Sequence, residues 1–212
     1  MTTETVNYLL RYFEALHSIN RNTITLCGTD VDLIHFDYEK LLLDAVSNIT
    51  RIIPITYDKS NNKLVLKKSD GILSLNHEFT ELSDDFESIL NAHYDLINNL
   101  RLIRNNYQHN VHLISTPSLC TSDHGLFTLG IEIGTQHITF HLGSFIYLLK
   151  DLNVVMNKIV NKVQAYKSNK ENANHYSAYL DRLTFMSFEE YNTIFNLNIK
   201  ILKSIGKSNI GF

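Results

Sequence analysis

The chain has few cysteines, no long apolar run and no glycine-rich loop, and each absence excludes a class of protein. Its 212 residues include no stretch of about 18 consecutive apolar residues, so we expect no membrane-spanning helix. The first residues lack the basic and apolar regions of a secretory signal peptide. Cys27 and Cys120 are the only cysteines and do not have the spacing of a metal site, which favours a cytoplasmic protein with two free thiols.

The pattern also excludes the common nucleotide-binding α/β folds. No glycine-rich phosphate-binding loop occurs, and strands do not alternate with helices as they would in a Rossmann or P-loop fold. The hydrophobic content of 44% and the charged content of 19% are ordinary for a globular protein. A chain of this length can bury one sizeable core. We therefore expect a single domain over residues 1–212.

The net charge of −3 argues against strong nonspecific binding to nucleic acid, but the charge is unevenly distributed. Residues 1–149 contain 10 lysines and arginines and 17 aspartates and glutamates, whereas residues 150–212 contain 9 and 5. The two parts therefore carry charges of −7 and +4. The C-terminal third forms either a basic face or a set of outer helix faces on which the lysines are solvated.

Apolar residues at helical spacing predict a mainly α protein. The most amphipathic segment begins near Ser83, where acidic residues suit the positive end of a helix, and continues to about Arg104. Asn105 and Asn106 tolerate the left-handed conformation that often ends a helix, so this helix either stops there or continues to His112. The other expected helices cover residues 3–20, 31–53, 144–166 and 187–205, with a polar loop at 167–174.

Two segments interrupt the helical pattern. In residues 55–75, turn signals flank a short predicted strand at 63–67, which indicates a small β-meander or hairpin between helices. Residues 126–142 are typical of a β-hairpin, because apolar and polar side chains alternate on either side of a turn at Gly134 and Thr135. The expected fold is therefore a bundle of four to six helices with these two β insertions.

The sequence Arg104-Asn105-Asn106-Tyr107-Gln108-His109 places two chemically complementary side chains near the end of the amphipathic helix. A guanidinium is a permanent cation with a planar donor fork suited to a phosphate. An imidazole can accept or donate a proton near neutral pH. Metal-free RNA cleavage needs both functions, because protons must move at the 2′- and 5′-oxygens and the phosphorane charge must be stabilised. Arg104 and His109 are therefore the candidate catalytic residues.

The spacing of these two residues restricts the arrangement of the site. Positions five apart in a straight helix lie about 140° around its axis. Arg104 and His109 can therefore share a face only if the helix ends or distorts between them. Alternatively, each meets its counterpart from a second subunit, because a twofold dimer brings two copies of both residues into one cleft. Asn105 can add a hydrogen bond to a phosphate oxygen or orient the histidine.

This stretch resembles the Arg-polar-x-x-x-His signature of the HEPN superfamily, and the helical pattern over about residues 77–170 is similar to that family's bundle. The resemblance implies a metal-independent endoribonuclease without a cofactor, which cleaves RNA by attack of the 2′-hydroxyl. It implies that Arg104 and His109 are catalytic and that Asn105 and Tyr107 support them. It further implies a homodimer that acts in phage defence or as a toxin and is controlled by an antitoxin or sensor protein.

Other features support competing hypotheses. The chain can instead be a non-catalytic helical dimer that acts as a scaffold, an RNA-binding module or a regulator. Arg11 and His17 form a second arginine–histidine pair, but we expect a solvated arginine and a packed histidine inside a continuous helix. We expect His93 to be a satisfied, buried histidine. No metal is assigned, although a zinc site is conceivable from five histidines that lack a clear carboxylate or cysteine partner: His109, His112, His124, His137 and His141.

Overall fold

The computed structural model describes residues 3–28, 44, 46–49, 51–77, 79, 81–109, 118–121, 127–133 and 135–168. This part of the chain is mostly helical, which confirms the mainly α prediction. Its α-helices are α1 (Thr3–Gly28), α3 (Leu82–Ala92), α4 (Tyr94–His109) and α5 (Leu142–Ser168). Its strands are β1 (Ile55–Asp58), β2 (Lys63–Leu66), β3 (Ser118–Thr121), β4 (Phe127–Ile133) and β5 (Gln136–His141), and η2 (Gly71–His77) is a 3₁₀ helix.

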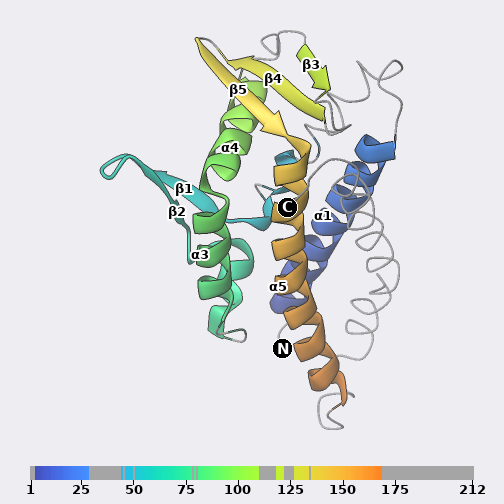
Figure 1. Ribbon diagram of the computed structural model, residues 1–212. Coiled ribbons are helices and arrows are strands. Elements are labelled where there is room, and N and C mark those ends of the chain that lie inside the picture. The colour runs from blue at the N-terminus through green and yellow to red at the C-terminus, as the bar shows by residue number, and fades with distance from the viewer. Residues whose placement is uncertain are drawn as a thin grey trace.

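Helix α5 lies at the centre of the described part, with α1 on one side and α3 on the other (Figure 1). The wide apolar face predicted for α5 is buried. Burial of so large an apolar surface is the main source of stability. Its buried apolar residues are Phe145, Ile146, Leu148, Leu149, Leu152, Val155, Met156, Ile159, Val160 and Val163. The opposite face carries exposed residues such as Tyr147, Val154 and Lys158.

A cluster of aromatic residues joins α1, α3 and α5. Phe86 of α3 is fully buried, and its ring packs edge-on against Tyr12 of α1 with ring centroids 6.4 Å apart. The Tyr12 hydroxyl donates a hydrogen bond to the Leu152 carbonyl oxygen of α5, at 3.3 Å. Burial raises the pKa of Tyr12 far above its usual value, so this hydroxyl stays protonated and continues to donate.

The amphipathic segment that begins near Ser83 is two helices, and the prediction of one continuous helix was wrong. At His93 the backbone has φ −123° and ψ 27°, which ends α3, and α4 begins at Tyr94. The His93 side chain is 14% exposed and lies 2.8 Å from an Asp151 carboxylate oxygen of α5. As expected, this histidine is largely buried and has a polar partner. The His93–Asp151 contact therefore links the junction of α3 and α4 to the central helix α5.

Replacing His93 with alanine is expected to lower the free energy of unfolding by about 1 kcal/mol, because a part-buried hydrogen bond to a carboxylate is lost. Urea denaturation followed by circular dichroism measures this change. Lys68→Ala is the matched control, since Lys68 and Glu87 are 4.0 Å apart and both are well exposed. Equal stability of the two variants would show that the His93–Asp151 contact does not hold the junction.

The segment expected as a hairpin at 126–142 belongs to a three-stranded antiparallel sheet of order β3-β4-β5. Along β5 the expected alternation is present: Ile138 and Phe140 are buried, whereas His137, Thr139 and His141 are exposed. The Phe140 ring contacts Phe145 of α5, with centroids 5.4 Å apart. The sheet lies at one end of α4, and β5 continues directly into α5 (Figure 1).

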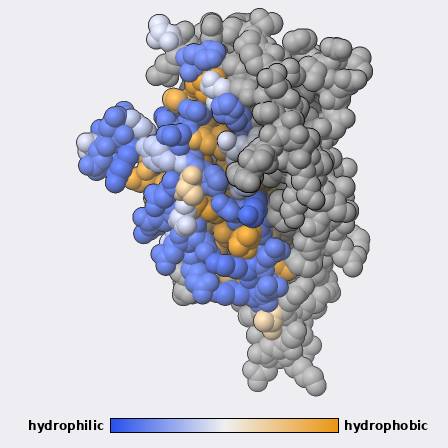
Figure 2. Space-filling model, in the orientation of Figure 1, coloured by the Kyte–Doolittle hydropathy of each residue, from blue (hydrophilic) through white to orange (hydrophobic). Residues whose placement is uncertain are grey.

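Strands β1 and β2 form an antiparallel hairpin that projects from the body beside α3 and α4 (Figure 1). Its turn contains Asn62 with φ 51°, and the backbone nitrogen of Ser60 donates to an Asp58 carboxylate oxygen at 2.9 Å. Hydrophilic residues cover the tip of the hairpin (Figure 2). The Tyr94 hydroxyl of α4 accepts a hydrogen bond from the Leu64 backbone nitrogen of β2 at 2.9 Å, which anchors the hairpin to α4.

Several helices end at other residues than predicted, and parts of two predicted helices lie outside the described residues. Helix α1 continues past residue 20 to Gly28, and α5 continues through Lys167 to Ser168, where a loop was expected. Residues 46–49 and 51–52 are helical, as the predicted second helix requires, whereas its first half lies outside the described residues. The expected helix at 187–205 also lies outside them. Among the helices described, none combines the length and apolar character needed to cross a membrane.

Candidate functional site

Helix α4 runs without interruption through the Arg104–His109 stretch. The possible stop at Asn105 and Asn106 is therefore not used. Helix α4 is described as far as His109, and the predicted continuation to His112 lies outside the described residues. Arg104 and His109 then lie about 140° apart around the axis of one helix. The Arg104 side chain is partly buried and lines a cavity, whereas the side chains of Tyr107 and His109 lie outside the described residues.

The cavity has a volume of about 960 Å³ and is lined by residues from five structural elements. One wall is a face of α1, and a second is the helical segment that precedes Pro54. The remaining walls come from the starts of β1 and η2 and from Arg104 of α4. The lining residues are Tyr8, Arg11, Tyr12, Glu14, Ala15, Ser18, Asp44, Asn48, Arg51, Ile52, Pro54, Ile55, Asp70, Gly71, Ile72 and Arg104.

Three arginines from three different segments line this cavity: Arg11 of α1, Arg51 and Arg104. Arg11 and Arg51 are exposed, so a ligand can reach these two side chains without unfolding of the protein. Within the described part of the chain, no carboxylate forms an ion pair with any of the three. A guanidinium is always charged and presents its donors in a plane that fits two phosphate oxygens. The cavity can therefore bind a ligand with one or more phosphates.

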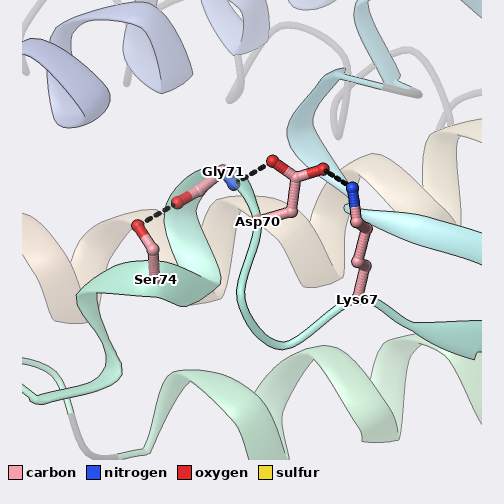
Figure 3. Close-up of polar contacts among 4 residues, drawn as sticks. All are labelled: Lys67, Asp70, Gly71 and Ser74. Carbon is pink, nitrogen blue, oxygen red and sulfur yellow. Dashed lines mark hydrogen bonds and ion pairs between the residues drawn. The ribbon is translucent and has the colours of Figure 1, made fainter.

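Three carboxylates also line the cavity, and two of them have partners of their own. Ser18 of α1 donates a hydrogen bond to Asp44 at 3.2 Å. Asp70 accepts hydrogen bonds from the Lys67 ammonium and from the Gly71 backbone nitrogen, each at 2.9 Å (Figure 3). The hydrogen bond from Lys67 is the main cause of a lowered pKa of Asp70, so this carboxylate stays ionised. Glu14 is the third and is exposed.

The backbone at Asp70 is shaped by the residue that follows it. Gly71 has φ +53°, a conformation that side-chain-bearing residues adopt at a cost, and it begins η2. The Gly71 carbonyl oxygen accepts a hydrogen bond from the Ser74 hydroxyl at 2.7 Å, which closes the first turn of η2 (Figure 3). This turn keeps the Asp70 carboxylate beside Lys67, so the nearby ammonium offsets its negative charge at the edge of the cavity.

The arginines of the two arginine–histidine pairs meet in this cavity. Arg11 is exposed, as expected for a solvated residue, and His17 is partly buried in α1. The sequence patterns did not predict Arg11 or Arg51 as part of a site. The pair that Arg11 forms with His17 drew attention to Arg11, but it predicted only a solvated arginine. No local pattern marks Arg51.

The histidine-rich metal site stays a hypothesis, since His109, His112 and His124 have side chains outside the described residues. His137 and His141 are exposed on one face of β5. Within the described ranges, no group of three or more histidine, cysteine, aspartate or glutamate residues is arranged to hold a metal ion. No protein-family model matches the chain, and no curated protein or solved structure matches it.

Proposed function

We propose that the protein is a HEPN-type, metal-independent endoribonuclease that binds RNA phosphates at the three-arginine cavity. The observation that carries this proposal is the position of Arg104. The residue singled out from the sequence for phosphate binding lines a cavity with two further arginines that are remote from it in sequence. Convergence of cations from separate segments is what a polyanion-binding site requires, because each guanidinium can neutralise one phosphate.

In this mechanism the 2′-hydroxyl of a ribose attacks the adjacent phosphorus atom. A new oxygen–phosphorus bond forms, the bond to the 5′-oxygen breaks, and the products are a 2′,3′-cyclic phosphate and a 5′-hydroxyl. Arg104 holds the scissile phosphate and stabilises the negative charge of the phosphorane. His109 transfers a proton, as a base at the 2′-oxygen or as an acid at the 5′-oxygen. Arg11 and Arg51 hold neighbouring phosphates, and Asn105 and Tyr107 support the site.

A homodimer is part of the proposal. Because α4 is continuous, the positions of Arg104 and His109 in one chain lie about 140° apart around the helix axis, so helix geometry alone does not bring the two residues to one phosphate. A second copy of α4 related by a twofold axis can supply the missing imidazole to each arginine. Each site would then consist of Arg104 from one subunit and His109 from its partner.

One observation favours a different function. The continuous helix also fits a protein that binds RNA through Arg11, Arg51 and Arg104 without cleaving it, since binding does not require His109. In that case the protein is a regulatory or scaffolding RNA-binding module. The two functions share the cavity and differ only in proton transfer.

Incubation of labelled single-stranded RNA with the protein in EDTA separates the two functions. The ribonuclease cleaves in EDTA and leaves 2′,3′-cyclic phosphate ends, which resist a phosphatase that removes only terminal monophosphates. Arg104→Ala is expected to lose both cleavage and most of the binding. Binding without cleavage by the unmodified protein would support the RNA-binding module and contradict the ribonuclease. Neither binding nor cleavage would contradict both.

Replacing Arg51 with alanine is expected to weaken binding of single-stranded RNA about tenfold or more, because one charge-assisted contact to a phosphate is lost. The salt dependence should change as well. The slope of log K against log salt should fall in magnitude by about 0.7, the value for one phosphate contact on a single strand. Fluorescence anisotropy over a salt series measures both quantities. Lys150→Ala is the control, since Lys150 is an exposed cation on α5 that does not line the cavity.

A further inference from the structure

A tyrosine and an arginine form a stacked pair beside the cavity. The guanidinium carbon of Arg101 in α4 lies 4.8 Å from the ring centroid of Tyr57 in β1. Tyr57 nevertheless keeps 37% of its surface exposed, and it pairs with Leu64 across the hairpin. An exposed aromatic ring and a guanidinium plane are the two surfaces on which nucleobases stack in proteins that bind single-stranded nucleic acid.

Both side chains are held in place by separate hydrogen bonds. The Tyr57 hydroxyl donates to the side-chain oxygen of Asn62 in the hairpin turn. The Arg101 guanidinium donates to the side-chain oxygen of Asn98 through Nη2, at 3.0 Å, and through Nε, at 3.3 Å. The hairpin is itself anchored to α4 through Tyr94. The pair is therefore ordered before any ligand arrives, which reduces the entropic cost of binding.

The Tyr57–Arg101 pair lies beside the three-arginine cavity, because α4 and β1 each contribute one residue to the pair and one to the cavity lining. Arg101 and Arg104 are three residues apart in α4, so they are neighbours on one helix face. Tyr57 and Ile55 are two residues apart in β1, so they share one strand face at a separation of about 7 Å. Arg104 and Ile55 both line the cavity. A nucleotide whose phosphate contacts Arg104 can therefore place a base at Tyr57.

We propose that Tyr57 and Arg101 form a stacking subsite for an unpaired nucleobase of RNA. This proposal rests on the proposed binding of RNA phosphates at the cavity, and it names single-stranded or looped RNA as the class of substrate. A paired base is already stacked within its duplex and presents no free face to Tyr57. Stacking accepts any base, so this subsite selects strand state and not sequence. Exposed Lys59 and Lys63 on the same hairpin supply further positive charge.

The test uses the full chain and a fluorescent single-stranded RNA with 2′-O-methyl groups, which cannot be cleaved because it has no 2′-hydroxyl. Tyr57→Ala is expected to weaken binding about 5- to 150-fold, the range for loss of one base–aromatic stack. Tyr57→Phe keeps the ring and is expected to bind nearly as tightly as the unmodified protein. Tyr147→Ala removes an exposed tyrosine on α5, which is 52% exposed, and should leave binding unchanged.

A second measurement distinguishes stacking from a general disturbance of the hairpin. The same RNA is prepared with a single base removed at successive positions. At one position the loss of the base should weaken binding to the unmodified protein but not to Tyr57→Ala, because the stack is then already absent. This pattern cannot arise from misfolding, since the affected protein is the unmodified one.

The outcomes separate the subsite from the proposed function. If Arg104→Ala loses affinity while Tyr57→Ala binds as tightly as Tyr147→Ala, the stacking subsite is wrong and the phosphate site stands. If Arg104→Ala and Tyr57→Ala both bind as the unmodified protein does, both proposals are wrong. Equal affinity for duplex and single-stranded RNA of the same length would also overturn the stacking subsite.

Discussion

Replacing His109 with alanine is expected to reduce the rate of RNA cleavage by about 10²- to 10⁴-fold, the usual contribution of a positioned acid or base. Affinity for RNA should change little, because the arginines of the cavity and not the imidazole hold the phosphates. The comparison is made at saturating RNA in EDTA, so that only the chemical step differs. His137→Ala is the control, since His137 is an exposed histidine on β5 that does not line the cavity.

The continuous α4 makes a sharper version of this experiment possible. Arg104→Ala and His109→Ala are each expected to be inactive alone. If the site combines Arg104 of one subunit with His109 of its partner, a dimer that contains one copy of each variant has one intact site. Mixing the two proteins should then restore up to about a quarter of the activity, since about half of the dimers are mixed and each has one of two sites.

Two results would contradict this arrangement. No recovery on mixing, together with evidence that the subunits exchange, would place Arg104 and His109 of the same chain in one site. An unchanged cleavage rate of His109→Ala would exclude the imidazole from the chemistry altogether. Subunit exchange is checked independently by energy transfer between differently labelled chains.

The largest expected effect on stability is at Phe86. Phe86→Ala should lower the free energy of unfolding by about 3 to 5 kcal/mol, because the change removes a fully buried ring and leaves a cavity among α1, α3 and α5. Such a loss is a large share of the stability of a typical domain, about 5 to 15 kcal/mol. Urea denaturation followed by circular dichroism gives the value, provided that the transition is two-state.

Val154→Ala provides the comparison for this measurement. Val154 lies on α5 but is 48% exposed, so its truncation is expected to change stability by less than about 0.5 kcal/mol. Phe86→Leu should fall between the two, since leucine refills part of the space. A loss below about 1 kcal/mol for Phe86→Ala would show that the junction of the three helices is not a principal part of the core.

The elements that the sequence predicted well are those with a strong repeating pattern. The apolar face of α5 is buried as the helical spacing required, and Ile138 and Phe140 of β5 point to the core as the alternation required. The pattern did not reveal the break at His93. Apolar residues continue at helical spacing on both sides of it, and the contact with Asp151, 58 residues away in sequence, has no local signature.

The candidate site was predicted only in part, for a related reason. Arg104 was identified because the motif is local, spanning six consecutive residues. Arg11 and Arg51 become neighbours of Arg104 only when α1, the segment before Pro54 and α4 pack together. Single-sequence patterns describe which face of a helix is apolar, but they do not say which polar faces of separate helices will meet. A three-dimensional arrangement is needed for that.

The junction of β5 and α5 has a mechanical consequence. β5 ends at His141 and α5 begins at Leu142, so no linker separates the sheet from the central helix. The buried rings of Phe140 and Phe145 contact each other across this junction and stabilise it. A protein that bound the outer edge of the sheet and displaced it would therefore also tilt α5. The helices packed against α5 would move with it.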